Sequence, residues 1–163
     1  MKLLLVRHAI AVPAGAPDIA DEDRPLTKRG RKRFKKAARG LARVVPCPAL
    51  LLTSPLPRAL ETAEIAADAW GGVAPTPEPL LAGGSAADLV PALAARDDAG
   101  VVALVGHEPG ISALLAHLIG GAADGLPFKK GGAALVALDG DGAGSGRLLW
   151  FLPPRVLRAL GGD

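Results

Sequence analysis

Uninterrupted apolar runs alternate with amphipathic stretches along the chain, and each pattern predicts a different element. Short apolar runs that end at polar or turn residues predict buried strands at residues 2–7, 49–54 and 101–106. Apolar residues at helical spacing predict helices at residues 28–45, 55–70, 85–96 and 109–120. Buried strands separated by helices are typical of a mostly parallel sheet that is covered on both faces.

The remaining segments complete the predicted fold. Residues 132–140 and 146–152 predict a final pair of strands joined by a glycine-rich turn, and a short helix is expected over 153–160. A short edge strand is expected near Leu80-Leu81, inside a stretch rich in proline and glycine. The chain has 163 residues and contains no long linker, so we expect one α/β domain over 1–163 with three α/β/α layers.

The predicted helix over residues 28–45 is strongly basic. Its first half, KRGRKRFKK, carries seven basic residues in nine, although the net charge of the whole chain is +3. Thr27 is a suitable N-cap, and an apolar stripe runs along the helix at Phe34, Ala37, Ala38, Leu41, Ala42 and Val45. The charges therefore cover a solvated face, and the alternative is a surface for nucleic acid or another anion. No aromatic residues are interleaved for base stacking, so no nucleic-acid partner is expected.

Composition excludes several other classes of protein. Half of the residues are hydrophobic, which argues against disorder. The single cysteine, Cys47, excludes an intramolecular disulfide and a cysteine-based zinc cluster. The apolar run at the N-terminus is interrupted by Arg7-His8 and is too short for a secretory signal, and no run is long enough to span a membrane. We therefore expect a cytoplasmic protein with no membrane partner.

Arginine and histidine side chains follow each of the three predicted buried strands. The first strand ends at Arg7-His8, and the third is followed by His107 in the sequence GHEPG. The second ends in TSPLPR, where Ser54 is expected to cap the next helix and Arg58 lies in its first turn. Because ligands bind at the carboxyl ends of strands in open α/β sheets, we expect these groups to meet at one edge.

Two arginines and two histidines at one edge have a chemical meaning. Arginine presents a planar fork of donors that suits phosphate, and helix N-termini add backbone donors. One histidine can attack phosphorus and form a covalent intermediate, while a protonated second histidine stabilises charge on the oxygens. Each residue alone could be purely structural. The two histidines could also bind a metal, but no further ligand occurs at a suitable spacing, so no metal or cofactor is expected.

Three segments resemble motifs of the histidine phosphatase superfamily, also called the phosphoglycerate mutase-like family. They are LLLVRHA, TSPLPRALETA and LVGHEP. The short length, the segment DRPLTKRG and the ending LLWFLPPRVLRAL resemble SixA-type phosphohistidine phosphatases within it. The resemblance implies a phosphoglycerate mutase-like fold, with His8 as the phosphorylated nucleophile. It also implies that Arg7, Arg58 and His107 hold the phosphoryl group and that Arg24 lies near them.

The sequence departs from the family pattern at two motif positions and in one segment. Ala9 replaces the usual glycine after the first histidine, and Glu61 replaces a common glutamine, which we expect to affect only packing or hydrogen bonding. Many relatives that cleave phosphate esters carry an acidic residue in a longer central segment. Here that segment is short, and Glu78, Asp88 and Glu108 are only weak candidates for the acid. His117 lies off the apolar stripe of its helix and is expected at the surface.

The missing acid favours a substrate whose leaving group needs no proton donor. The conjugate acid of imidazole has a pKa of about 6.5, so imidazole leaves more easily than the alkoxide of an ester. We therefore expect a metal-independent phosphatase that acts on phosphohistidine, with a phosphohistidine-bearing signalling protein as the partner. One alternative is a phosphatase for small phosphate monoesters. Another is a non-catalytic module that binds anions or nucleic acid through the basic helix over residues 28–45.

Overall fold

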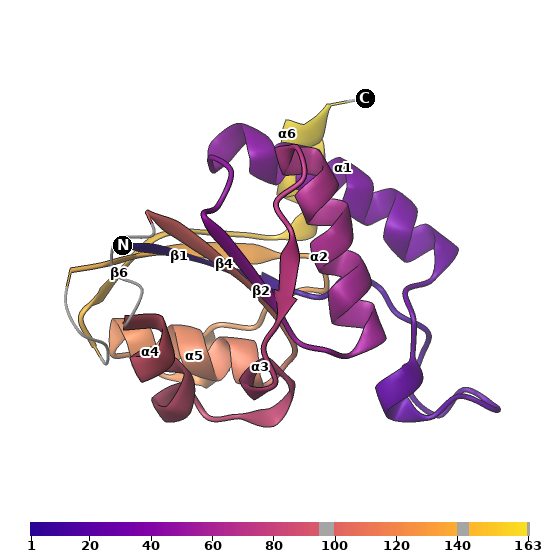
Figure 1. Cartoon of the computed structure of the whole chain (residues 1–163), viewed down its shortest axis with the longest axis horizontal. Coiled ribbons are helices and arrows are strands. Elements are labelled where there is room, and N and C mark those ends of the chain that lie inside the picture. Colours follow the sequence, from indigo (N-terminus) through magenta and orange to yellow (C-terminus); the bar gives the residue numbers. More distant parts are fainter. Residues whose placement is uncertain (95–99, 140–143, 163) are drawn as a thin grey trace.

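A single sheet organises the protein (Figure 1). The computed structural model describes residues 1–94, 100–139 and 144–162. Within this part of the chain the sheet has six strands in the order β3-β2-β4-β1-β5-β6. The strands are β1 (Lys2–Arg7), β2 (Leu50–Thr53), β3 (Pro75–Pro77), β4 (Val101–Gly106), β5 (Ala133–Leu138) and β6 (Gly146–Leu152).

The pairing of the strands confirms the mostly parallel sheet. Strand β1 pairs in parallel with β4, and β2 pairs in parallel with β4 and with β3. Strand β5 runs antiparallel to β1 and to β6, as expected for a final pair joined by a turn. Residues 140–143 of that predicted turn lie outside the described residues.

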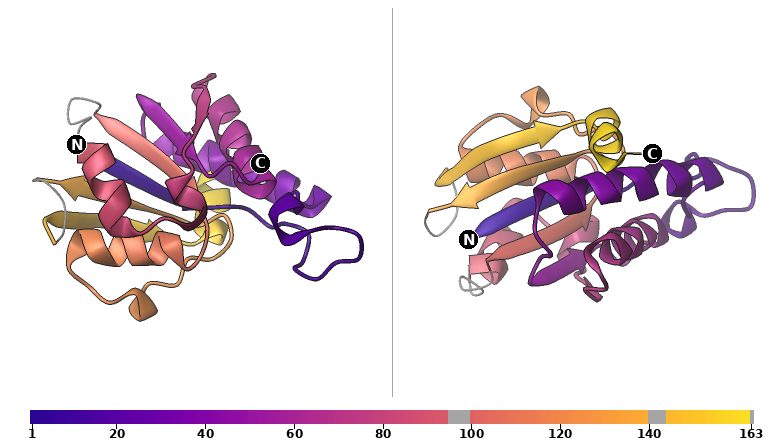
Figure 2. Two further views of the ribbon diagram at one scale, coloured as in Figure 1. Left: turned by 60° about the horizontal axis from the view of Figure 1, so that its bottom comes forward. Right: turned by 90° about the horizontal axis from the view of Figure 1, so that it is seen from above.

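Helices cover both faces of the sheet, which confirms the α/β/α layers (Figures 1 and 2). Helices α1 (Lys28–Val44), α2 (Pro57–Trp70) and α6 (Pro154–Gly161) pack on one face. Helices α3 (Leu80–Gly83), α4 (Ala86–Ala94) and α5 (Gly110–Ile119) pack on the other. The expected helix over 85–96 thus corresponds to α4, and its last two positions lie outside the described residues. None of the described helices is long and apolar enough to cross a membrane.

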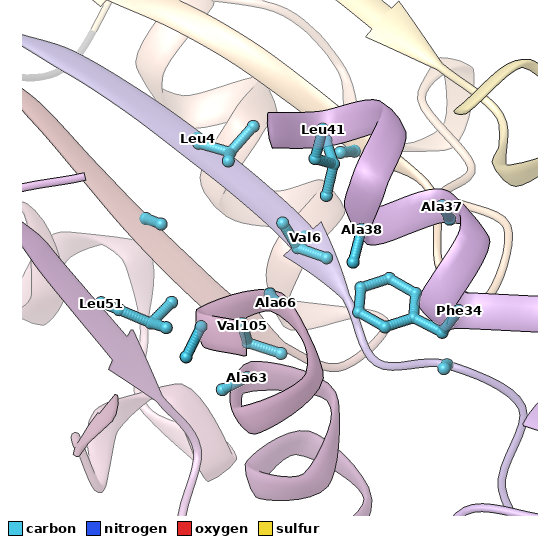
Figure 3. Close-up of a cluster of buried hydrophobic side chains, with 14 of the residues drawn as sticks. Leu4, Val6, Phe34, Ala37, Ala38, Leu41, Leu51, Ala63, Ala66 and Val105 are labelled. Atoms are coloured by element: carbon cyan, nitrogen blue, oxygen red, sulfur yellow. The ribbon is translucent and has the colours of Figure 1, made fainter. Parts of the chain in front are cut away.

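Alternation along β1 supplies side chains to two separate cores. Leu4 and Val6 point into the cluster under α1 and α2, which Figure 3 shows. Leu3 and Leu5 point into the cluster under α4 and α5. All four leucine and valine side chains are at most 1% exposed. A strand that is apolar at every position is therefore required here, because successive side chains serve opposite faces of the sheet.

Helix α1 confirms the prediction made from its apolar stripe. Phe34, Ala37, Ala38 and Leu41 are buried against the sheet, and the Thr27 side chain accepts a hydrogen bond from the Gly30 amide at the start of the helix. Most of its lysines and arginines face solvent. The basic run is thus a solvated helix face, as the sequence indicated.

Three local predictions were wrong. Leu80-Leu81 begins the short helix α3, because Leu81 and Ala82 amides donate to the carbonyls of Glu78 and Pro79; the edge strand is β3, a few residues earlier. Helix α2 begins at Pro57 with Leu56 as its N-cap, so Ser54 does not cap it. His117 is half-buried rather than at the surface, and its carbonyl accepts a hydrogen bond from the Gly144 amide of the β5–β6 connection.

Candidate active site

The register of β1 and β4 brings two histidines together at the carboxyl edge of the sheet. Arg7 is opposite Gly106 in this parallel pair, so His8 and His107 are the next residues on neighbouring strands. The His8 amide donates to the Gly106 carbonyl, and the centroids of the two imidazole rings are 5.1 Å apart. Arg58 reaches the same edge from the first turn of α2. The structure therefore brings together the four residues that the sequence selected.

His8 is held as a neutral imidazole with one free nitrogen. Its Nδ1 lies 2.7 Å from the Ala9 carbonyl oxygen. Because a carbonyl can only accept, Nδ1 carries the proton and the lone pair lies on Nε2. Burial lowers the pKa of His8 to about 3, and the nearby charges of His107, Arg58 and Arg7 act in the same direction. At neutral pH the Nε2 lone pair is thus available for attack on phosphorus.

The backbone after His8 is anchored to α2. The Ala9 amide donates to Thr62 Oγ1 at 3.0 Å, and the Thr62 hydroxyl in turn donates to the Arg58 carbonyl at 2.7 Å. Ala9 is buried and, unlike Asp18, does not adopt a positive φ angle. Glycine is therefore not needed at this position, which accounts for the tolerated departure from the family motif.

His107 has one engaged and one open ring nitrogen. Its Nε2 lies 2.7 Å from Ser54 Oγ, which also accepts a hydrogen bond from the Leu56 amide. The Ser54 hydroxyl proton is then satisfied by donating to Nε2, and this leaves the ring proton of His107 on Nδ1. Burial lowers the pKa of His107 to about 4, and the charges of Arg58, Arg24 and Arg7 lower it further. A bound anion would oppose that shift.

Each arginine of the site is held by hydrogen bonds at the Nη end of its guanidinium group. Arg7 Nη1 donates to the Phe128 carbonyl at 2.6 Å. Arg58 Nη1 donates to the Asp21 carbonyl at 2.7 Å, and its Nη2 lies 3.6 Å from the Asp21 carboxylate. Burial is the main cause that lowers the pKa of each arginine. These bonds orient the two guanidinium groups and leave the two Nε atoms available to a ligand.

Three buried nitrogens have no hydrogen-bond partner in the described part of the chain: Arg7 Nε, Arg58 Nε and His107 Nδ1. Buried polar groups without partners are rare in native proteins, because each costs the full desolvation penalty. All three belong to the same edge of the sheet and can donate a hydrogen bond. They therefore form a cradle for a ligand with several acceptor oxygens, such as a phosphoryl group.

Arg24 lies beside this cradle and shares an acidic partner with Arg58. Arg24 Nε is 2.9 Å from Asp21 Oδ1, and its Nη1 donates to the Val12 carbonyl at 2.7 Å. Asp21 therefore connects the loop that precedes α1 to two arginines of the site. Sequence reasoning missed Asp21, Ser54 and Thr62 as supports of the site. The available signal was that Ser54 and Thr62 are polar residues close to Arg58 in the sequence.

The three candidate acids are placed differently. Glu108 Oε1 accepts hydrogen bonds from Ser112 Oγ at 2.7 Å and from the Phe128 amide at 2.8 Å. Glu78 Oε1 accepts from the Leu80 amide at the start of α3. Asp88 is exposed, and hydrogen bonds from Ser85 lower its pKa, so it carries no proton at neutral pH.

Glu61, the other departure from the family motif, acts as a structural acceptor. Its Oε1 accepts from the Leu26 amide at 3.0 Å, and its Oε2 binds Arg31 at 2.6 Å. These bonds attach the beginning of α1 to α2. The geometry therefore supports the expectation that Glu61 affects packing and hydrogen bonding.

A hollow of about 290 Å³ adjoins His107 on the α3–α5 side of the sheet. Its walls are mostly apolar side chains and glycine-rich backbone, and they include Leu81, Leu89 and Ile111. The ionisable residues in its lining are His107 and Glu108, and no lysine or arginine of the described chain lines it. We call it the α3–α5 pocket. It offers space next to the phosphoryl cradle for the part of a substrate that carries the phosphoryl group.

The fold and this cluster of arginines and histidines are those of a phosphatase. The family model of the histidine phosphatase superfamily (branch 1) matches residues 3–83, and this protein belongs to that superfamily. It is similar to the protein histidine phosphatase SixA solved with tungstate, with a TM-score of 0.83 and 27% identity over 96% of this chain and 99% of that one.

Two further proteins are similar to this chain. A proposed phosphohistidine phosphatase SixA of Agrobacterium tumefaciens gives a TM-score of 0.80 at 29% identity, over 94% of this chain and 97% of that one. An uncharacterized protein of Picosynechococcus sp. is 41% identical over 114 residues, which are 67% of each chain. The similarity to SixA structures extends over nearly the whole chain, as the sequence motifs indicated.

Proposed function

We propose that this protein hydrolyses the phosphoryl group of phosphohistidine on a protein through a phospho-His8 intermediate. The observation that carries the proposal is the cradle of unpartnered nitrogens beside a histidine whose Nε2 lone pair is free. Arg7, Arg58 and His107 bind the phosphoryl oxygens, and Arg24 adds positive charge at the rim. The proposed reaction requires no metal or cofactor.

In the first step, the lone pair of His8 Nε2 attacks phosphorus. The bond between phosphorus and the leaving nitrogen breaks, and that nitrogen takes the bonding electron pair. The charge on the transferred oxygens is stabilised by hydrogen bonds from the Arg7, Arg58 and His107 nitrogens. His8 Nδ1 keeps its proton and its hydrogen bond to Ala9, so the positive charge of the phosphorylated ring is shared with a carbonyl dipole.

In the second step, water attacks the phosphorus of phospho-His8. The bond from phosphorus to Nε2 breaks, Nε2 recovers its lone pair, and inorganic phosphate leaves. The two steps together consume one water and release the dephosphorylated substrate and phosphate. Splitting the reaction into two displacements of nitrogen is the benefit of a histidine nucleophile.

The α3–α5 pocket supports a phosphohistidine substrate. A leaving group with a second phosphate or carboxylate would find Glu108 and apolar walls there, and no lysine or arginine. An imidazole leaving group is uncharged or positive, and with a pKa of about 6.5 it needs little help from a proton donor. The charge of the pocket and the low basicity of a leaving imidazole therefore both favour cleavage of a P–N bond.

A phosphatase for small phosphate monoesters is the second candidate, and Glu108 is the observation that favours it. Its carboxylate lines the same pocket as His107, and among the described residues only its Oε1 atom has hydrogen-bond partners. If Oε2 carried a proton, it could protonate the oxygen of a leaving alcohol. The two candidates therefore differ in whether Glu108→Gln lowers the rate.

The proposal is tested with purified protein on phosphohistidine and on aliphatic phosphate esters side by side. We expect faster turnover of phosphohistidine, unchanged by a metal chelator or by Glu108→Gln. His8→Ala should abolish turnover while the folded structure survives, because no other side chain in the site presents a free nitrogen lone pair. His117→Ala, which removes a histidine of α5 outside the site, is the matched control. Full activity of the His8→Ala variant would contradict the mechanism, and preferential turnover of esters would favour the second candidate.

A further inference from the structure

Three cations converge on the face of the molecule that lies beside the active site. Arg33 of α1, Arg158 of α6 and Lys130 of the segment before β5 line one shallow hollow of about 20 Å³. Its floor includes Ala9 and Ile10, the two residues that follow His8. No acidic residue in the part of the chain that the structure describes lines it. We call Arg33, Lys130 and Arg158 the cationic rim.

The cationic rim has no role within the described parts of the fold. Among residues 1–94, 100–139 and 144–162, none of its three side chains makes a hydrogen bond or an ion pair. By contrast, Arg31 of the same helix binds Glu61, and Arg43 donates to the Leu160 carbonyl. Like charges held close together without a counter-charge repel one another, so the rim is unfavourable until an anion binds.

The surrounding surface extends the same charge. Helices α1 and α6 lie side by side on one face of the sheet, as the right-hand view of Figure 2 shows. Neither helix contains an acidic residue, and Arg29, Lys32 and Arg155 are further exposed cations on them. The carboxylate that α1 binds, Glu61, belongs to α2 on its other flank. The face thus attracts an extended acidic surface rather than a single ion.

From these observations we infer that the cationic rim docks an acidic surface of the protein whose phosphohistidine is hydrolysed, an inference that rests on the proposed function. Consecutive Cα atoms are about 3.8 Å apart, so a group held above Ala9 lies within a residue or two of the nucleophile His8. A partner bound there presents its phosphorylated side chain to the cradle. The 20 Å³ hollow admits the tip of a carboxylate side chain and is too small for a base or sugar.

The residues of the α1–α6 face favour a protein as the binding partner over a nucleic acid. Phe34 is the aromatic residue of α1, and it is buried at 2% exposure, while α6 contains no aromatic residue. Binding of single strands relies on exposed aromatic side chains on which bases stack. Carboxylates on a folded partner need only the charge and the fork geometry that arginine provides.

The test combines a charge reversal with a matched control. The rim variant is Arg33→Glu, Lys130→Glu, Arg158→Glu; the control variant, Lys28→Glu, Lys35→Glu, Arg39→Glu, makes the same change in net charge on exposed residues of α1 that do not line the hollow. Within the described residues, neither set of side chains makes a hydrogen bond, so both variants should fold. Equal unfolding midpoints for the two proteins check this.

Activity is measured on phosphohistidine in an acidic carrier protein and on free phosphohistidine. For the rim variant, we expect kcat/KM on the carrier to fall by about tenfold or more, mainly through KM and mainly at low salt. For the control variant, kcat/KM on the carrier should fall by less than about threefold. On free phosphohistidine, kcat/KM should differ by less than about twofold among the proteins. Equal losses in the two variants, or equal losses on the two substrates, would overturn the inference.

A binding experiment separates this inference from the proposed function. A fluorescent glutamate-rich peptide that contains an unphosphorylated histidine is titrated with each protein, so no turnover is needed. The rim variant should bind it about tenfold more weakly than the control variant. Wild-type protein that fails to bind the peptide, or that binds a single-stranded oligonucleotide of equal charge more tightly through the same residues, contradicts an acidic protein partner even if phosphohistidine is hydrolysed.

Discussion

The two faces of the sheet are packed in different ways, and each contributes a different part of the site. On the α1–α2–α6 face the helices approach one another closely: a Cβ atom at Gly40 would lie 2.0 Å from the Leu157 carbonyl oxygen, and one at Gly161 would lie 2.0 Å from the Lys36 carbonyl oxygen. On the other face α3, α4 and α5 leave the α3–α5 pocket of about 290 Å³ open beside His107.

The closely packed face positions the reacting groups, and the other face leaves space for the substrate. Thr62 of α2 connects the backbone at Ala9 to the Arg58 carbonyl, so the nucleophile and one cation are positioned by the closely packed face. His107 is followed by α5, whose first residues form a wall of the pocket. A phosphoryl group needs the fixed geometry of the first face, whereas its carrier needs the room on the second.

The largest expected effect tests the packing itself. Gly40→Ala should lower the free energy of unfolding by about 3 kcal/mol, because its methyl group collides with backbone rather than with a movable side chain. Gly83→Ala, at the end of α3, is the matched change on the open face. Nothing lies within 4 Å of its Cβ position, so stability should stay within about 0.5 kcal/mol of the wild type or rise slightly. Urea denaturation measures both, and equal losses would contradict the comparison.

The sequence predicted the closely packed elements better than the open ones. The stripe of α1 and the apolar strands follow from periodicity, because burial on a known face leaves a regular pattern. The apolar pair Leu80-Leu81 is too short to show the periodicity of a strand or of a helix. Only the hydrogen bonds to the carbonyls of Glu78 and Pro79 show that it is helical. The size of the α3–α5 pocket depends on how the short helices pack together, which no local pattern encodes.

The same contrast applies within the site. Arg7, His8, Arg58 and His107 could be selected because polar residues at the ends of buried strands need a reason to be there. Ser54 resembled a helix cap, and only the approach of β4 to β2 reveals that its hydroxyl serves His107. The contact of Asp21 with both Arg24 and Arg58 depends on the path of the loop before α1, which the sequence does not specify.

The second prediction tests the neutral state of His8. In the folded protein its pKa is about 3, whereas an exposed histidine in the unfolded chain has a pKa of about 6.5. Between these values the unfolded state binds a proton that the folded state excludes, so stability falls as the pH is lowered from 6.5 toward 3. His8→Asn removes this difference. Between pH 7 and pH 5 the variant should lose about 2 kcal/mol less stability than the wild type.

Urea denaturation at a series of pH values measures that difference. His107, with a folded pKa of about 4, adds an acid loss of the same sign in both proteins, so it cancels when the two curves are compared. Parallel curves for the wild type and His8→Asn would mean that His8 has the same pKa in the folded and unfolded protein. In that case burial would not keep the imidazole neutral below pH 6.5.

The smallest expected effect tests the open face as the place for the leaving group. Ala86 is half-buried and lines the α3–α5 pocket, whereas the next residue, Ala87, is exposed and lies outside the lining. Ala86→Trp should lower kcat/KM for phosphohistidine in a polypeptide by about fivefold, close to 1 kcal/mol, because the indole fills the space that the carrier needs. Inhibition by inorganic phosphate should be unaffected, since the cradle of Arg7, Arg58 and His107 is unchanged. Ala87→Trp adds the same bulk outside the pocket and should retain wild-type kcat/KM; if both variants lose activity equally, or if phosphate inhibition weakens with Ala86→Trp, the two faces do not divide the site in this way.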